Sequence, residues 1–95
     1  MKNEILNILK TEKPTLAKEF GVEEIGVFGS VERNTDSEES DIDIMVKLKK
    51  ATFSAMMGLL IYLEKRLDRK VDLVRKGNHL PERFMKQVER DIIYV

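Results

Sequence analysis

The sequence predicts an α+β fold in which a small β-sheet is flanked by helices, and two patterns predict it. Residues 42–48 alternate Ile, Ile, Val and Leu with Asp, Met and Lys, which is the two-residue period of a half-buried strand. Residues 52–69 place apolar side chains at spacings of three and four, which is the period of a helix. Because 95 residues suffice for one core, we expect a single domain over residues 1–95.

Two short helices are expected ahead of the sheet. Residues 2–11 gather their apolar side chains on one helical face. Pro14 then suits the first turn of a second helix, where its missing N–H costs nothing. This helix should end at Gly21, because glycine readily takes the left-handed conformation that follows a helix.

The first strand is expected at residues 22–28, an apolar run rich in β-branched side chains that stops at Gly29 and Ser30. Residues 34–40 are polar and turn-forming, so they predict a loop. The second strand, residues 42–48, follows this loop.

The rest of the chain predicts one more strand and one more helix. Residues 71–75 form the third strand, and residues 76–78 form a turn. A last short helix is expected at residues 81–89, with an apolar face made of Leu80, Phe84 and Val88. Residues 92–95 fit either a final short strand or a frayed tail.

The composition excludes several classes of protein. Seventeen basic and 17 acidic side chains give a formal net charge of zero, so no direct DNA binding is expected. The absence of cysteine excludes disulfides, iron–sulfur clusters and thiolate zinc sites. The longest uncharged stretch, residues 51–63, is too short to span a bilayer, and the N-terminus lacks the apolar core of a signal peptide. We therefore expect a cytoplasmic protein with no membrane partner.

Two carboxylates at the start of the second strand suggest a metal site. Residues two apart in a strand point to the same face, so Asp41 and Asp43 project together while Ile42 and Ile44 enter the core. Two neighbouring negative charges repel unless a cation lies between them. Carboxylate oxygens suit Mg²⁺ or Mn²⁺. Taken alone, however, an Asp-x-Asp pair is more often a turn or a solvated strand face.

A third carboxylate lies in the next strand. Asp72 stands between Val71 and Leu73, where an isolated aspartate is poorly suited to a strand. If the second and third strands are neighbours, Asp72 completes a triad with the two earlier aspartates. Three carboxylates can hold two metal ions, which activate an attacking oxygen and stabilise a leaving pyrophosphate.

A phosphate-binding turn precedes the aspartates. Gly29 lets the backbone approach a phosphate, and Ser30 offers a hydroxyl and an amide at the start of a short helix through Arg33. A triphosphate held there would have its α-phosphorus near the carboxylates. This arrangement is the one that nucleotidyl transfer requires, and the complete set is far more specific than its parts.

The spacing Gly29-Ser30, ten residues, Asp41-Ile42-Asp43 resembles the signature of the DNA polymerase β-like nucleotidyltransferase superfamily. Residues 27–34 and 40–46 are similar to those of minimal nucleotidyltransferases, the short MNT-domain antitoxins that partner HEPN-domain toxins. The resemblance covers nearly the whole chain and implies the nucleotidyltransferase fold with a small mixed sheet. After Gly-Ser-x this family often has Ala-Arg-Gly, of which Arg33 is kept.

The resemblance implies a role for each matching residue. The catalytic and metal-binding residues would be Asp41, Asp43 and Asp72. The residues that bind the nucleotide would be Gly29, Ser30 and Arg33. The implied cofactor is Mg²⁺, as two ions and with Mn²⁺ as the alternative, and the implied substrate is ATP.

The family also implies a biological role. Such proteins are antitoxins of type VII-like pairs that transfer AMP from ATP to a tyrosine hydroxyl of the HEPN-domain RNase toxin and so neutralise it, in a hetero-oligomer with that toxin. Two alternatives stay open. One is a non-catalytic module of the same fold that neutralises its partner by binding, and the other is a nucleotidyltransferase that acts on a small molecule or RNA.

Overall fold

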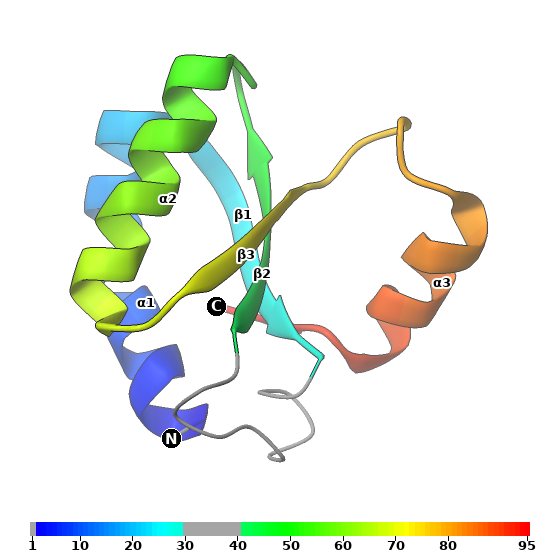
Figure 1. Cartoon of the computed structure of the whole chain (residues 1–95), viewed down its shortest axis with the longest axis horizontal. Helices are drawn as coiled ribbons and strands as arrows, with labels where there is room; N and C mark the ends of the chain where they lie inside the picture. The colour runs from blue at the N-terminus through cyan, green and yellow to red at the C-terminus, as the bar shows by residue number, and fades with distance from the viewer. Residues whose placement is uncertain (1, 30–40) are drawn as a thin grey trace.

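The computed structural model describes residues 2–29 and 41–95, which form helices around a β-sheet (Figure 1). In chain order the elements are α1 (Lys2–Phe20), β1 (Val22–Phe28), β2 (Ile42–Leu48), α2 (Phe53–Leu67), β3 (Val71–Arg75), α3 (Glu82–Asp91) and β4 (Ile93–Tyr94). The α+β class predicted from the sequence is confirmed.

One mixed sheet organises the molecule, with the strand order β3-β2-β1-β4. β1 runs antiparallel to both of its neighbours, β2 and β4, whereas β2 and β3 are parallel. Parallel neighbours need a long crossover connection, and α2 supplies it. The short final strand, one of the two options for residues 92–95, is the one that the structure shows.

The two faces of the sheet are covered by different helices (Figure 1). On one face, α1 and α2 enclose the main core, whose fully buried members include Leu9, Leu16, Ile25, Ile42, Ile44, Leu59 and Leu63. On the other face, α3 packs on a smaller cluster made of Phe28, Met45 and Val88. The predicted apolar side of the last helix is confirmed, since Leu80 and Phe84 also pack there.

The expected break between two N-terminal helices is wrong, because α1 continues through Pro14. Proline removes one backbone hydrogen bond and crowds the preceding turn, which disfavours a helix interior. Burial outweighs this cost, since Ile5, Leu9 and Leu16 lie on one stripe of α1 in the main core. No helix in the described part of the chain is both long and apolar enough to cross a membrane.

Local signals set the ends of α2. The Thr52 hydroxyl caps its first turn by accepting a hydrogen bond from the Ala55 amide at 3.1 Å. At the other end Asp68 takes the left-handed conformation, with φ of 54°. The helix therefore stops shortly before residue 69, and β3 begins at Val71, where the Glu64 carboxylate accepts a hydrogen bond from the backbone amide at 3.0 Å.

Candidate active site

The pairing of β2 with β3 places two of the predicted catalytic aspartates side by side. The two strands are parallel neighbours, and their register sets Asp43 opposite Asp72. The expectation that these strands are neighbours is therefore confirmed. Asp41 is exposed and immediately precedes β2, so its expected position on the same face as Asp43 stays a prediction. The side chains of Ile42 and Ile44 point to the other face of the sheet and are buried in the main core.

The end of β1 closes directly on Asp43. The register of β1 and β2 sets Phe28 opposite Asp43, so Gly29 follows at the edge of the carboxylate. A Cβ atom built on Gly29 would overlap the Asp43 carboxylate and would lie 3.1 Å from its Cγ. Gly29 also has a φ of +70°, a conformation that residues with a side chain adopt at a cost. Only glycine fits this point, which explains the first residue of the Gly-Ser pair.

The donor set suits a hard divalent cation in its chemistry. Asp72 is exposed and Asp43 is half-buried, so carboxylate oxygens face solvent at this end of the sheet. Such oxygens are what Mg²⁺ prefers. Within residues 2–29 and 41–95, however, no three acidic, His or Cys side chains gather into a metal-binding group. The fold brings the backbone positions of the aspartates together, and the triad itself stays a prediction.

Two of the predicted nucleotide-binding residues lie outside the described residues. Ser30 and Arg33 belong to residues 30–40, whose roles are inferred from the sequence alone. Their assignment to the nucleotide therefore stays a prediction, whereas the position of Gly29 is established by its contact with Asp43.

A small hollow adjoins Gly29 on the side of α3. Its volume is about 170 Å³, and it is lined by Phe28, Gly29, Phe84, Gln87, Val88 and Asp91. The two phenylalanine rings meet edge to face, with centroids 6.4 Å apart and an interplanar angle of 84°. Sequence reasoning missed this hollow. Helical periodicity identifies the apolar side of α3, but it does not show that the polar residues of α3 lie beside the end of β1.

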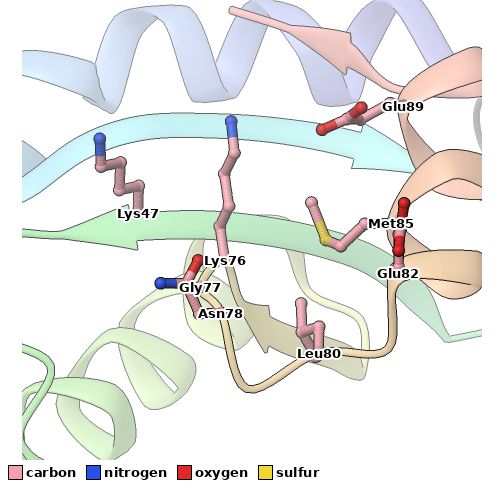
Figure 2. A pocket seen from close by; sticks show the side chains of 8 residues that line it. All are labelled: Lys47, Lys76, Gly77, Asn78, Leu80, Glu82, Met85 and Glu89. Carbon is pink, nitrogen blue, oxygen red and sulfur yellow. The ribbon is translucent and has the colours of Figure 1, made fainter.

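A larger hollow of about 500 Å³ lies at the opposite end of the same sheet face (Figure 2). Lys47 on β2 and Lys76 after β3 line it from the sheet side, and Met85 and Glu89 line it from α3. Lys47 is four residues beyond Asp43, about 13 Å along a strand. The face covered by α3 therefore runs from an acidic end at the aspartates to an end of mixed charge.

Lys76 joins three strands at that end. Its ammonium donates to Glu24 Oε1 at 3.0 Å and to the Tyr94 hydroxyl at 3.2 Å, and it lies 5.2 Å from the centre of the Tyr94 ring. The hydrogen bond from Lys76 holds the pKa of the Glu24 carboxyl below its usual range. The hydrogen bond to Glu24, followed by that to Tyr94, raises the pKa of Lys76. This group ties β3 to β1 and β4, and no sequence pattern predicted it.

A comparison with protein families agrees with the site. The family model described as polymerase beta, nucleotidyltransferase matches residues 4–95. This chain belongs to the polymerase β-like nucleotidyltransferase family. A protein adenylyltransferase, MntA of Thermococcus cleftensis, is 42% identical over 97% of this chain and 93% of its own length. The resemblance proposed from Gly29-Ser30 and Asp41-Ile42-Asp43 is thereby confirmed.

Solved structures show the same nucleotidyltransferase fold. A protein described as a minimal nucleotidyltransferase has a TM-score of 0.80 and 32% identity, over 98% of this chain and 95% of that one. A toxin–antitoxin structure with AMP-PNP has a TM-score of 0.72 and 26% identity, over 90% and 70%. A complex of tri-AMPylated Shewanella oneidensis HEPN toxin with MNT antitoxin has a TM-score of 0.59 and 26% identity, over 98% and 66%.

Proposed function

We propose that this chain is an antitoxin that transfers AMP from ATP to a tyrosine hydroxyl of a partner HEPN-domain toxin and so neutralises it. The 42% identity to a protein adenylyltransferase supports the group that is transferred. The likeness to an antitoxin in complex with a tri-AMPylated HEPN toxin supports the partner. The AMP-PNP in a similar toxin–antitoxin structure supports ATP as the donor. Because the reaction consumes ATP, we place the protein in the cytoplasm.

The observation that carries the proposal is the meeting of three segments at one sheet end. Gly29 lies against the Asp43 carboxylate, and Asp43 lies opposite Asp72 in the parallel register of β2 and β3. We infer that Asp41, two residues before Asp43, joins them on the same face. Gly29, which we propose binds phosphate, is therefore adjacent to the Asp43–Asp72 pair, and the transfer of a nucleotidyl group to an oxygen requires such proximity.

Each residue has a defined task in the proposed reaction. Gly29 and Ser30 bind the triphosphate of ATP, and Arg33 neutralises its charge. Asp41, Asp43 and Asp72 would hold two Mg²⁺ ions, which stabilise the charge that develops on the attacking and leaving oxygens. The acceptor hydroxyl attacks the α-phosphorus in line, a new O–P bond forms, and the bond to pyrophosphate breaks. Asp72 accepts the hydroxyl proton as the attack proceeds.

Transfer of labelled nucleotide tests the proposal. The purified chain is incubated with Mg²⁺, α-labelled ATP and native lysate, and label on protein is measured for the wild type, for Asp43→Asn and for Asp68→Asn. Asp68 caps α2 and is our matched control, because asparagine also accepts the left-handed conformation there. We expect label on one small partner with the wild type and with Asp68→Asn, and none with Asp43→Asn.

Other outcomes would identify the two alternatives. A stable complex with an unlabelled partner, formed equally by the wild type and by Asp43→Asn, would indicate neutralisation by binding alone. Label confined to small molecules or RNA would show that the acceptor is not a protein. Either result would overturn the proposed transfer to a HEPN toxin.

A further inference from the structure

We propose that the hollow beside Gly29 holds the adenine ring of the nucleotide, and that Gln87 on α3 selects adenine over guanine. This inference rests on the proposed function, because it names the subsite that recognises the base of the donor ATP. The aspartate motif gives α3 no role. In this inference α3 determines which nucleotide base is bound.

The position of the hollow connects it to the reaction centre. Gly29 is one of its lining residues and is also the residue in contact with the Asp43 carboxylate. The base and the α-phosphate of a nucleotide are joined only through one ribose, so their binding sites must be near neighbours. A ring in this hollow satisfies that condition, whereas the larger hollow near Lys47 lies about 13 Å further along β2.

The size and lining of the hollow suit a ring and not a whole ligand. Its volume is about 170 Å³. Sites for whole small molecules measure about 300–1,000 Å³, whereas an apolar cavity of about 150 Å³ is enough for one benzene molecule. Two phenylalanines and Val88 supply apolar walls, and Phe84 is half-buried, so part of its ring stays accessible beside the edge-to-face contact with Phe28.

Two polar side chains of α3 determine which ring fits. Gln87 and Asp91 are four residues apart on the helix, so they lie on one side of it, and both line the hollow. A glutamine amide offers one donor and one acceptor, which matches the ring nitrogen N7 and the amino group of adenine. Guanine presents two acceptors along the same edge, so the amide can satisfy only one of them.

Asp91 strengthens the same preference along that edge. A carboxylate accepts hydrogen bonds but cannot donate them. It can therefore receive the amino group of adenine, whereas the corresponding carbonyl oxygen of guanine would face it unfavourably. The acceptor tyrosine is a less suitable occupant of this hollow. Its hydroxyl would be hydrogen-bonded to Asp91 on α3, away from the aspartates of β2 and β3 at which it must react.

The test is the ratio of the dissociation constants for two nucleotide analogues. Titration calorimetry with AMP-PNP and GMP-PNP, each with Mg²⁺, is applied to the wild type, to Gln87→Ala and to Gln87→Glu. Lys86→Ala is the matched control, since Lys86 is exposed on the same helix but does not line this hollow. Gln87 is also exposed, so its substitution leaves the core of the protein unchanged.

We expect the wild type and Lys86→Ala to bind the adenine analogue more tightly than the guanine analogue. Gln87→Ala should reduce this preference by about fivefold or more, which is the lower end for a bidentate contact to a base. Gln87→Glu should retain it, because a carboxylate at this position still accepts a hydrogen bond from the adenine amino group and faces the guanine carbonyl unfavourably. An unchanged ratio in Gln87→Ala would overturn the inference. So would the absence of any preference, or of any nucleotide binding, in the wild type.

The design separates this inference from the proposed function. If Asp43→Asn abolishes labelled transfer while Gln87→Ala keeps the full preference for adenine, transfer stands and the assignment of the hollow fails. If Gln87→Ala impairs transfer to the partner without changing the ratio, the hollow binds the acceptor, and the assignment to adenine is again wrong. If Asp43→Asn transfers normally, the proposed function fails.

Discussion

The carboxylate of Asp43 occupies the space that a side chain on Gly29 would need. We therefore predict that Gly29→Ala loses nucleotidyl transfer and also destabilises the fold, because the added methyl group must displace the carboxylate from the site. The left-handed backbone alone should cost about 1–2 kcal/mol, and overpacking against Asp43 should add about 1–3 kcal/mol. Urea denaturation gives the loss of stability, and the labelling assay gives the loss of transfer.

Gly21→Ala is the matched control for this substitution. Gly21 has nearly the same φ, +71°, but a Cβ atom there meets only ordinary contacts, the nearest being Lys49 Cβ at 3.7 Å. It should carry the backbone cost without the overlap and retain transfer. Equal losses of stability in the two variants would show that Asp43 moves aside freely, contrary to our expectation.

A second prediction concerns the repulsion between Asp43 and Asp72. Like charges opposite each other on neighbouring strands destabilise a sheet by about 0.2–1 kcal/mol. Asp72→Asn should therefore raise the free energy of unfolding by this amount in metal-free buffer while transfer is lost. The melting temperature of the wild type should rise on addition of Mg²⁺, because a ligand that binds the folded state stabilises it.

The response to Mg²⁺ distinguishes a metal site from a merely crowded pair of charges. We expect the shift caused by Mg²⁺ to disappear in Asp72→Asn and to persist in Asp68→Asn, which lies outside the site. A shift of the same size in all three proteins would argue against metal binding by Asp72. Removal of the metal with a chelator should abolish transfer by the wild type.

A third prediction follows from the course of α1 through Pro14. The ring costs about 3 kcal/mol in an ordinary helix interior, so Pro14→Ala should stabilise the protein by about 1–3 kcal/mol. Chemical denaturation measures the change directly. Lower stability in this variant would mean that the ring makes a packing contact worth more than the hydrogen bond that it removes.

Pro14 also shows what sequence patterns can and cannot predict. The proline rule is local, and it failed because long-range burial of Leu9 and Leu16 holds both halves of α1 against the sheet. The alternation of residues 42–48 is equally local, but it succeeded, because one buried face determines the register of a strand. Local sequence patterns thus predicted a helix or strand correctly wherever tertiary packing favoured the same structure.

The candidate site divides in the same way. The strand positions of Asp43 and Asp72 could be predicted, and a single assumption about neighbouring strands brought them together. The hollow near Gln87 could not, because it depends on which sheet face α3 covers and on where that helix ends. The group around Lys76 was equally hidden, since Glu24 and Tyr94 are distant in sequence and meet only across the sheet.

A fourth prediction concerns the dependence of stability on pH through Lys76. The bond from Lys76 lowers the pKa of Glu24 below its ordinary 4.5, so the stabilisation is complete above pH 4.5 and is lost as the pH falls through the folded-state value. Lys76→Met should cost about 0.2–1 kcal/mol at neutral pH, since both side chains are partly exposed. The difference from the wild type should shrink below pH 4.5.

The contribution of the Lys76–Glu24 pair to stability is also lost at high pH. The pKa of Lys76 is raised above its ordinary 10.5, so its contribution persists to that pH and is lost only at higher values. Lys86→Met is a suitable comparison, because the ion pair of Lys86 with Glu82 at 3.3 Å is far more exposed. Denaturation curves across this range would contradict the assignment if both substitutions cost the same at every pH.

The pairing of β1 with β4 has a consequence for synthesis of the protein. β1 is made early, but its outer neighbour comes from Ile93–Tyr94, and Val95 adds a hydrogen bond to the Ile25 carbonyl at 3.0 Å. While the chain is still being translated, β1 can pair only with β2, so its other edge remains open to foreign strands. The sheet is completed only after Val95 has emerged from the ribosome, so one edge of β1 stays unpaired throughout the earlier stages of synthesis.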